Sequence, residues 1–204
     1  MKKYSLTKNT KDWLGTTLYQ IKANVSFGSV SKGELGGWIE KEENLEQSGD
    51  AWVSSDAQVY GDAQVYGNAW VYGDARVYGN ARVYGNARVY GNARVYGDAR
   101  VYGDAWVYGN ARVYGDAWVY GNAWVYGDAW VYGNAWVYGK LKLTLGFFFG
   151  YRYKKEEIKY VKVDDDIELI CKGDIKVGEE DDEISKAIKL LEDSGKLKDG
   201  KILI

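Results

Sequence analysis

Residues 73–102 read GDARVY GNARVY GNARVY GNARVY GDARVY, which is one six-residue unit repeated five times in direct succession. Fifteen such units run from Gly49 to Tyr138, and almost all follow the pattern Gly-(Asp/Asn)-Ala-(Arg/Trp/Gln)-Val-Tyr. Self-similarity at a fixed period is the signature of a solenoid. The fifteen units hold ninety residues, which is five turns of eighteen, the length of one turn in a three-sided β-helix. The sequence therefore predicts an all-β solenoid, a three-sided β-helix of about five coils.

Each unit combines a short strand with a corner. In Ala-X-Val the small and β-branched residues alternate with the variable residue, so Ala and Val face one side of the strand and X faces the other. Gly-Asp or Gly-Asn then forms the corner, because Gly accepts positive φ and Asn and Asp tolerate it. We expect Ala and Val to line the interior and X to point outward.

Every third unit falls in vertical register, at a strand spacing of about 4.8 Å, so the outward residues sort into one column for each face. The first face carries Trp52, Trp70, Arg88, Trp106 and Trp124. The second carries Gln58, Arg76, Arg94, Arg112 and Trp130, and the third carries Gln64, Arg82, Arg100, Trp118 and Trp136. Tyrosines at intervals of six add further ladders, from Tyr60 to Tyr138.

A solenoid needs caps, because a bare end exposes unpaired strand edges and the apolar interior. We expect an N-terminal cap at residues 1–48, the β-helix at 49–138, and a small α+β cap or partner-binding module at 139–204. In the first cap, residues 4–7 and 16–21 predict a hairpin, and residues 36–39 with Leu45 predict a plug for the first coil. The last part predicts strands at 141–145, 151–153, 159–163 and 167–171, a helix near 182–192, and a final strand at 201–204.

The repeats, and the segment 27–40 that precedes them (FGSVSKGELGGWIE), resemble the bacterial and phage-borne hexapeptide-repeat proteins similar to YdcK. The resemblance covers residues 4–138. It implies a left-handed β-helix, and it brings no defined activity. Hexapeptide acyltransferases and β-helical carbonic anhydrases are looser relatives, since Val59 and Ala63 begin a series that fits their repeat spacing.

The sequence argues against an enzyme. Those relatives commonly use histidine as a base or as a zinc ligand, and histidine is absent from all 204 positions. The lone Cys171 lies in an apolar alternation typical of an inert core thiol. The eight corner Asp and seven corner Asn residues suit turns better than a metal site, because the two residue types interchange. We expect no catalytic residues, no cofactor and no metal.

Charge and hydropathy set further expectations. A formal net charge of −2 offers no global attraction for nucleic acid, which the sequence disfavours as a partner. No stretch approaches the roughly 20 apolar residues of a membrane span, and no signal peptide is evident, so we expect a cytoplasmic protein without membrane contact.

The outward columns are the candidate binding surface. Stacked Trp, Tyr and Arg can cover one another without any ligand, whereas exposed aromatic area tends to mark interfaces. Sugar rings, bases and partner proteins are all candidate occupants. The candidate residues are Trp52, Trp70, Trp106, Trp124, Arg76, Arg94, Arg112, Arg82, Arg100, Phe147, Phe148 and Phe149.

The leading functional hypothesis is a non-enzymatic scaffold whose C-terminal segment caps the helix and binds a partner, either a second copy in a dimer or trimer or another protein. Phe147 to Phe149 favour this role, because three adjacent Phe cannot all face one side of a strand. The alternatives are a phage-encoded inhibitor of a host protein and a degenerate hexapeptide acyltransferase.

Overall fold

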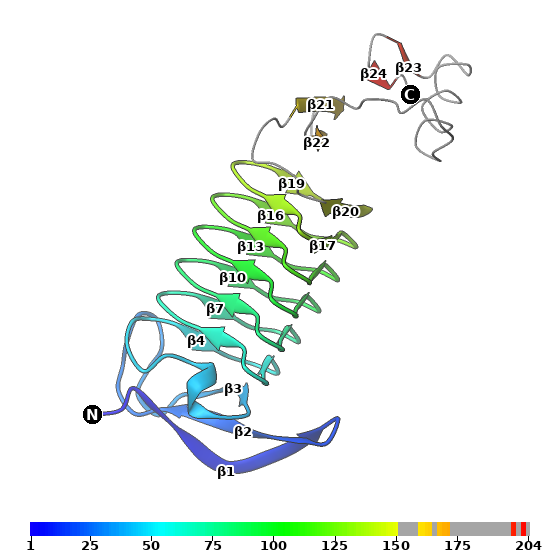
Figure 1. Ribbon diagram of the computed structural model, residues 1–204. Helices are drawn as coiled ribbons and strands as arrows, with labels where there is room; N and C mark the ends of the chain where they lie inside the picture. The colour runs from blue at the N-terminus through cyan, green and yellow to red at the C-terminus, as the bar shows by residue number, and fades with distance from the viewer. Residues whose placement is uncertain (151–158, 165–166, 172–196, 199–200, 203–204) are drawn as a thin grey trace. The chain divides into compact units, whose positions relative to one another are not determined.

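The computed structural model describes residues 1–150, 159–164, 167–171, 197–198 and 201–202. Two compact units divide the chain, residues 1–151 and residues 152–204. The first unit is a β-solenoid of about six turns whose strands stack into three sheets with parallel pairing between coils. Figure 1 shows the coils stacked one on another. The predicted three-sided solenoid is therefore confirmed.

Short strands occupy the Ala-X-Val part of each unit and sort by face as predicted. The first face holds β4 (Trp52–Val53), β7 (Trp70–Val71), β10 (Arg88–Val89), β13 (Trp106–Val107), β16 (Trp124–Val125) and β19 (Lys142–Leu143). The second holds β5 (Gln58–Val59), β8 (Arg76–Val77), β11 (Arg94–Val95), β14 (Arg112–Val113), β17 (Trp130–Gly133) and β20 (Phe147–Gly150). The third holds β6 (Gln64–Val65), β9 (Arg82–Val83), β12 (Arg100–Val101), β15 (Trp118–Val119) and β18 (Trp136–Val137).

The interior is a continuous column of alanine and valine side chains. Each Ala and Val of the repeats is at most 1 % exposed, which confirms the inward assignment. Hydrogen bonds between successive coils hold the column: the Arg94 amide donates to the Ala111 carbonyl at 2.9 Å, and the Tyr96 amide donates to the Val113 carbonyl at 3.0 Å. The outward side chains are thus mounted on a backbone whose polar groups are paired.

Glycine forms the corners because two demands coincide there. Gly97 has φ +68°, in the left-handed region, and a Cβ at this position would lie 3.0 Å from the backbone nitrogen of Gly115 in the next coil. Ser55 replaces Gly at the second corner and still takes a φ of +57°. Close approach of successive coils and positive φ together explain why glycine occupies this position in every repeat but the second.

The N-terminal cap contains the predicted hairpin and plug. Strands β1 (Tyr4–Trp13) and β2 (Thr16–Ala23) pair antiparallel, and β2 pairs with β3 (Leu35–Ile39). Strand β3 then runs parallel to β5, and after the 3-10 helix η1 (Glu42–Asn44) Leu45 bridges to Val65. Ile39 and Leu45 are buried, so they continue the inward column.

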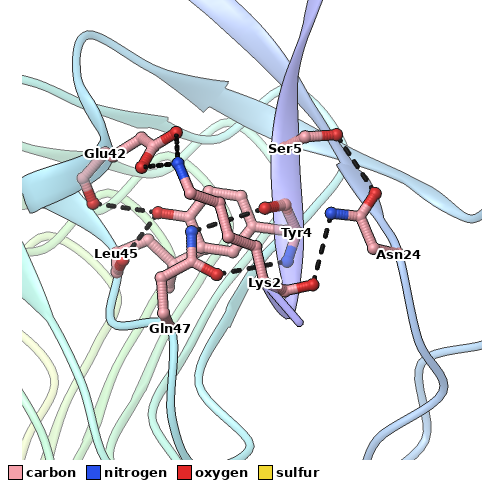
Figure 2. Close-up of polar contacts among 7 residues, drawn as sticks. All are labelled: Lys2, Tyr4, Ser5, Asn24, Glu42, Leu45 and Gln47. Carbon is pink, nitrogen blue, oxygen red and sulfur yellow. Dashed lines mark hydrogen bonds and ion pairs between the residues drawn. The ribbon is translucent and has the colours of Figure 1, made fainter.

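Polar contacts fasten this cap, as Figure 2 shows around Tyr4. The Tyr4 hydroxyl lies 2.6 Å from the Leu45 carbonyl oxygen, and the Lys2 ammonium lies 2.6 Å from a Glu42 carboxylate oxygen. Next to this cluster the buried Lys3 ammonium donates to the carbonyls of Ser48, Gly49 and Ala51 at 2.9 to 3.3 Å. The hairpin is thereby held against the residues where the repeats begin.

The solenoid extends past both ends of the repeat pattern. Strand β3 and Leu45 build part of a coil before Gly49, and β19 and β20 build another after Tyr138. The estimate of about five coils was therefore too low. The repeat motif disappears in these coils while apolar residues remain at inward positions, such as Ile39, Leu45 and Leu141, and so the count of repeats missed them.

The second unit contains β21 (Lys159–Asp164) paired antiparallel with β22 (Ile167–Cys171), and β23 (Leu197–Lys198) paired with β24 (Lys201–Ile202). The strands predicted at 159–163 and 167–171 are confirmed. The strand predicted at 151–153 and the helix predicted near 182–192 lie outside the described residues.

In the first unit, the strand predicted at 141–145 is shorter than expected, since β19 spans Lys142–Leu143.

Candidate functional site

The outward residues form the predicted columns. Register pairs join Trp70 to Arg88 and Arg88 to Trp106 on the first face. On the second face Arg94 pairs with both Arg76 and Arg112, and on the third Arg100 pairs with Arg82 and Trp118. Each face thus presents one ladder of outward side chains, with a tyrosine ladder beside it.

Most indole rings in these ladders are stacked within the protein. The ring of Trp106 lies 5.1 Å from that of Trp124 at an interplanar angle of 7°, and the Arg88 guanidinium lies 5.2 Å from the centre of the Trp106 ring. The Lys142 ammonium covers Trp124 at 4.9 Å. Both faces of Trp106 and Trp124 are therefore occupied by neighbours, and a sugar ring or a base has no room to stack on them.

The other two faces follow the same rule. Arg100 lies over Trp118 at 4.7 Å, and Trp118 stacks on Trp136 at 5.0 Å. On the second face Arg112 lies over Trp130 at 4.3 Å. The tyrosines stack as well, at 4.7 to 5.2 Å between ring centres. These ladders present mainly ring edges to a partner.

Trp52, expected on the outward surface, is fully buried. The N-terminal cap covers it: the rings of Tyr4 and Phe27 contact it edge-on, with centres at 6.3 and 5.4 Å. The outward column of the first face therefore begins to be accessible at Trp70. The N-terminal cap thus packs against Trp52.

The cap also covers the start of the second column. Gln58 is only 6 % exposed, and the Arg76 guanidinium lies 4.0 Å from the centre of the Trp13 ring, near the end of β1. Arg94 and Arg112 are half-buried and lie beyond this contact. The accessible part of the second column is thus its middle and its C-terminal end.

A groove of about 560 Å³ runs along the first face and its edge with the third face. Residues from the outward column, the corners and the cap line it: Trp70, Arg88 and Trp106; Asp50, Asn68, Asn86 and Asp104; Gly28 and Ser29. Its volume lies in the range of ligand pockets, although it is open to solvent. We call it the Trp70 groove.

Trp70 differs from the other indoles that line the repeats. It is half-buried, and among the described residues it has no stacking or cation–π partner. Arg88, in the next coil, turns to Trp106 instead. The Trp70 groove therefore combines an indole without a stacking or cation–π contact and an exposed guanidinium one coil away.

The walls of the groove are fixed by short-range contacts. The amide of Asn68 donates to the Asn86 side-chain oxygen at 3.2 Å, and the amide of Asn86 donates to an Asp104 carboxylate oxygen at 2.9 Å. At the other end, two backbone hydrogen bonds between Phe27 and Val30 close the loop that carries Gly28 and Ser29. The edge-on contact of the half-buried Phe27 ring with the buried Trp52 holds this loop in place.

The electrostatics of the groove are mixed. Arg88 supplies a cation near the middle, and Asp50 and Asp104 supply anions. Burial raises the pKa of Tyr72 and Tyr90, in the ladder beside the first-face column, while Arg88 lowers both in part. These hydroxyls stay protonated at neutral pH and lie outside the lining of the groove. The arrangement suits a ligand that carries both charges and an apolar group.

Of the predicted binding residues, the groove brings together Trp70 and Trp106 and places Arg88 between them. Trp124 lies farther along the same column, and the arginines of the other two faces lie outside the groove. The residues of the groove walls were not among those predicted. Asn68 and Asn86 stand two positions before outward residues, so the same register could have placed them beside Trp70 and Arg88.

The Phe147 to Phe149 segment forms β20, which continues the second sheet in register with Trp130, Val131 and Tyr132. Phe148 is half-buried and pairs with the inward Val131. A strand of the solenoid, rather than a separate cap, thus contains the three phenylalanines.

In the part of the chain that the structure describes, no group of three or more Cys, Asp or Glu side chains is placed to hold a metal ion. Over the same residues, no helix has the length and apolar character that crossing a membrane requires.

Comparison with known proteins bears on the repeats. No curated protein matches the chain. A family model described as the YdcK β-solenoid repeat matches ten overlapping windows that together span residues 57–139. This segment coincides with the stacked coils described above, and it carries the resemblance noted from the sequence. Residues 57–139 are therefore an array of YdcK β-solenoid repeats.

Proposed function

We propose that the protein is a non-enzymatic β-solenoid scaffold that binds a partner protein through the Trp70 groove. The observation that carries the proposal is Trp70, which has no stacking or cation–π contact among the described residues, beside the exposed Arg88. Tryptophan and arginine dominate the binding energy of protein interfaces, especially where they lie in a walled depression. The groove offers both residues on neighbouring coils.

The scaffold favours binding because little has to become ordered. Trp70 and Arg88 stand on strands whose amides donate to the next coil at 2.9 Å, and the groove walls are hydrogen-bonded to each other. Side chains held in this way lose less conformational entropy when a partner docks. Rigid display, rather than a moving site, is the mode of action that we propose.

A polypeptide suits the groove better than a sugar or a base. Among the described residues, Trp70 is the one repeat tryptophan without a ring or cation–π contact, whereas sequence-independent binding of a strand of bases uses a series of stacking platforms. A polypeptide can place an apolar side chain on Trp70, a carboxylate on Arg88, and a basic group on Asp50 or Asp104. The mixed charges of the groove thus match a mixed-charge partner.

The proposal can be tested by affinity capture from cells that express the protein natively, with a matched pair of variants. W70Q/R88Q removes one Trp and one Arg from neighbouring coils of the first face, and R100Q/W118Q removes the same residue types from the third. Gln58 and Gln64 already occupy outward positions, so both variants should fold. We expect the first variant to lose a partner that the second retains. A partner bound equally by both variants, or none captured by the unmodified protein, contradicts the proposal.

A further inference from the structure

The second face contains the longest run of like charges in the solenoid. Arg76, Arg94 and Arg112 are paired in register, one coil apart, at about 4.8 Å. On the third face the run is two arginines long, and on the first face Arg88 stands between tryptophans. We call Arg76, Arg94 and Arg112 the arginine column.

The arginine column has no anionic partner within the described residues. The ion pairs found there join Lys2 to Glu42 and Lys41 to Asp62, and neither involves a repeat arginine. Arg76 lies over Trp13 and Arg112 over Trp130, while Arg94 lies between two other guanidinium groups. Like charges this close repel each other, so an external anion would be favoured here.

The corners next to Arg94 and Arg112 carry no negative charge, and their amides donate along the corner ladder, from Asn92 to Asn110 and from Asn110 to Asp128. The corner residues that precede them are Asn92 and Asn110, where other coils of this face have aspartate. On the third face, by contrast, Asp98 directly precedes Ala99 and Arg100. The tyrosines that follow, Tyr96 and Tyr114, complete two neighbouring rows of Asn, Arg and Tyr. The middle of the second face is therefore the part of the repeats best suited to an anion.

We propose that the arginine column binds an acidic, extended polypeptide segment of a partner protein. Guanidinium groups form paired hydrogen bonds with carboxylates, and Arg94 and Arg112, which lie beyond the contact of Arg76 with Trp13, stand one coil apart at about 4.8 Å. An extended segment with two or three carboxylates can therefore engage them together. This surface lies on a different face from the Trp70 groove column and does not depend on it.

An acidic polypeptide fits better than nucleic acid for two reasons. The aromatic rings beside the column stack on each other, at 4.8 Å between Tyr78 and Tyr96 and between Tyr96 and Tyr114, and so offer no platform for bases. In addition, the exposed Asp98 and Asp116 lie just beyond the tyrosines and repel a continuous phosphate backbone. A polypeptide can avoid them or pair them with its own basic groups.

The test measures fluorescence anisotropy of a labelled twelve-residue peptide of alternating Glu and Ser at low salt. The matched variants are R94Q/R112Q, on the second face, and R82Q/R100Q, on the third. Each removes two arginines one coil apart, and in each pair one arginine lies over a tryptophan. Gln58 precedes Arg76 in the same column, so glutamine is compatible with the strand.

We expect R94Q/R112Q to weaken binding of the peptide roughly tenfold or more, since each exposed ion pair contributes up to about 1 kcal/mol. R82Q/R100Q should keep the affinity within about threefold, and raising the salt concentration should weaken all complexes. Equal losses in both variants would show an effect of total charge alone and overturn the proposal. So would the absence of binding, or tighter binding of a DNA duplex that depends on the same two arginines.

Discussion

The corner glycines allow a quantitative prediction about how the coils are stacked. At Gly97 an alanine meets two penalties: its φ of +68° is unfavourable for an L-residue, and its Cβ would lie 3.0 Å from the Gly115 nitrogen and 3.4 Å from the Gly115 Cα. Gly139 has a similar φ of +71°, but a Cβ there meets nothing within 4 Å. The two positions therefore share the conformational penalty and differ in the close approach of the next coil.

The magnitudes follow from these two terms. The left-handed conformation costs an L-residue about 1–2 kcal/mol, and overpacking adds typically about 1–3 kcal/mol where the neighbour cannot move. The backbone near Gly97 cannot easily move, because its carbonyl accepts the Asn80 amide at 2.9 Å. We expect G139A to destabilise the fold by about 1–2 kcal/mol and G97A by about 2–5 kcal/mol.

Urea unfolding followed by circular dichroism measures both values, provided that the slope with denaturant stays the same. A third variant, G97N, separates the two terms, since asparagine tolerates positive φ better but still carries a Cβ. We expect G97N to fall between G139A and G97A. Equal destabilisation by G97A and G139A would refute the argument that close stacking of coils, in addition to positive φ, requires glycine.

Four further predictions follow from the same structure. V95D should cost several kcal/mol because it buries an unpaired charge in the fully buried column, whereas R94Q should cost little, and a comparison of their melting temperatures checks this. Burial raises the pKa of Tyr96 and Tyr102 in the folded protein, whereas tyrosines in the unfolded chain ionise near pH 10. The stability of the fold should therefore be intact below pH 10 and should fall as the pH rises further, and unfolding followed by fluorescence at each pH measures this. Saturating coenzyme A or acetyl-coenzyme A should leave the melting temperature unchanged, and a clear rise would support the acyltransferase hypothesis. Deleting residues 85–102, one whole coil, should preserve cooperative unfolding, whereas deleting residues 85–93 should abolish it because inward and outward positions no longer match.

The regular part of the fold was predictable because the repeat leaves few choices. Once three hexads close a turn, the register of every outward residue follows, and the observed pairs, such as Arg94 with Arg112, agree with it. The ends were harder to predict. Burial of Trp52 depends on Tyr4 and Phe27, which are distant in sequence, and no periodic pattern signals such contacts.

The candidate site was predictable only in part, for a similar reason. Register places Trp70, Arg88 and Trp106 in one column, but it does not determine which ring face a neighbour covers. Arg88 turns to Trp106 and leaves Trp70 without a stacking partner among the described residues, a choice of side-chain conformation. The loop at Gly28 and Ser29, which closes the groove, belongs to the cap and lies outside the repeat logic.

The residue type at the outward positions depends more on the coil than on the face. The second face is an exception, and this exception supports the arginine column as a binding surface. Where arginine gives way to tryptophan along a column, the last arginine lies over the tryptophan of the next coil, as Arg88 does over Trp106 and Arg100 over Trp118. Those two columns change in the same coil, but the second face changes one coil later, at Trp130. Had it changed with the others, Arg94 would have gained an aromatic neighbour in place of Arg112. The delay instead leaves Arg94 between two guanidinium groups and without that favourable contact, while Arg112 lies over Trp130. Trp, Arg and Gln all occupy outward positions in this fold, so folding does not require arginine in two neighbouring coils of the second face. An anionic partner for Arg94 and Arg112 therefore explains the two arginines better than stability does.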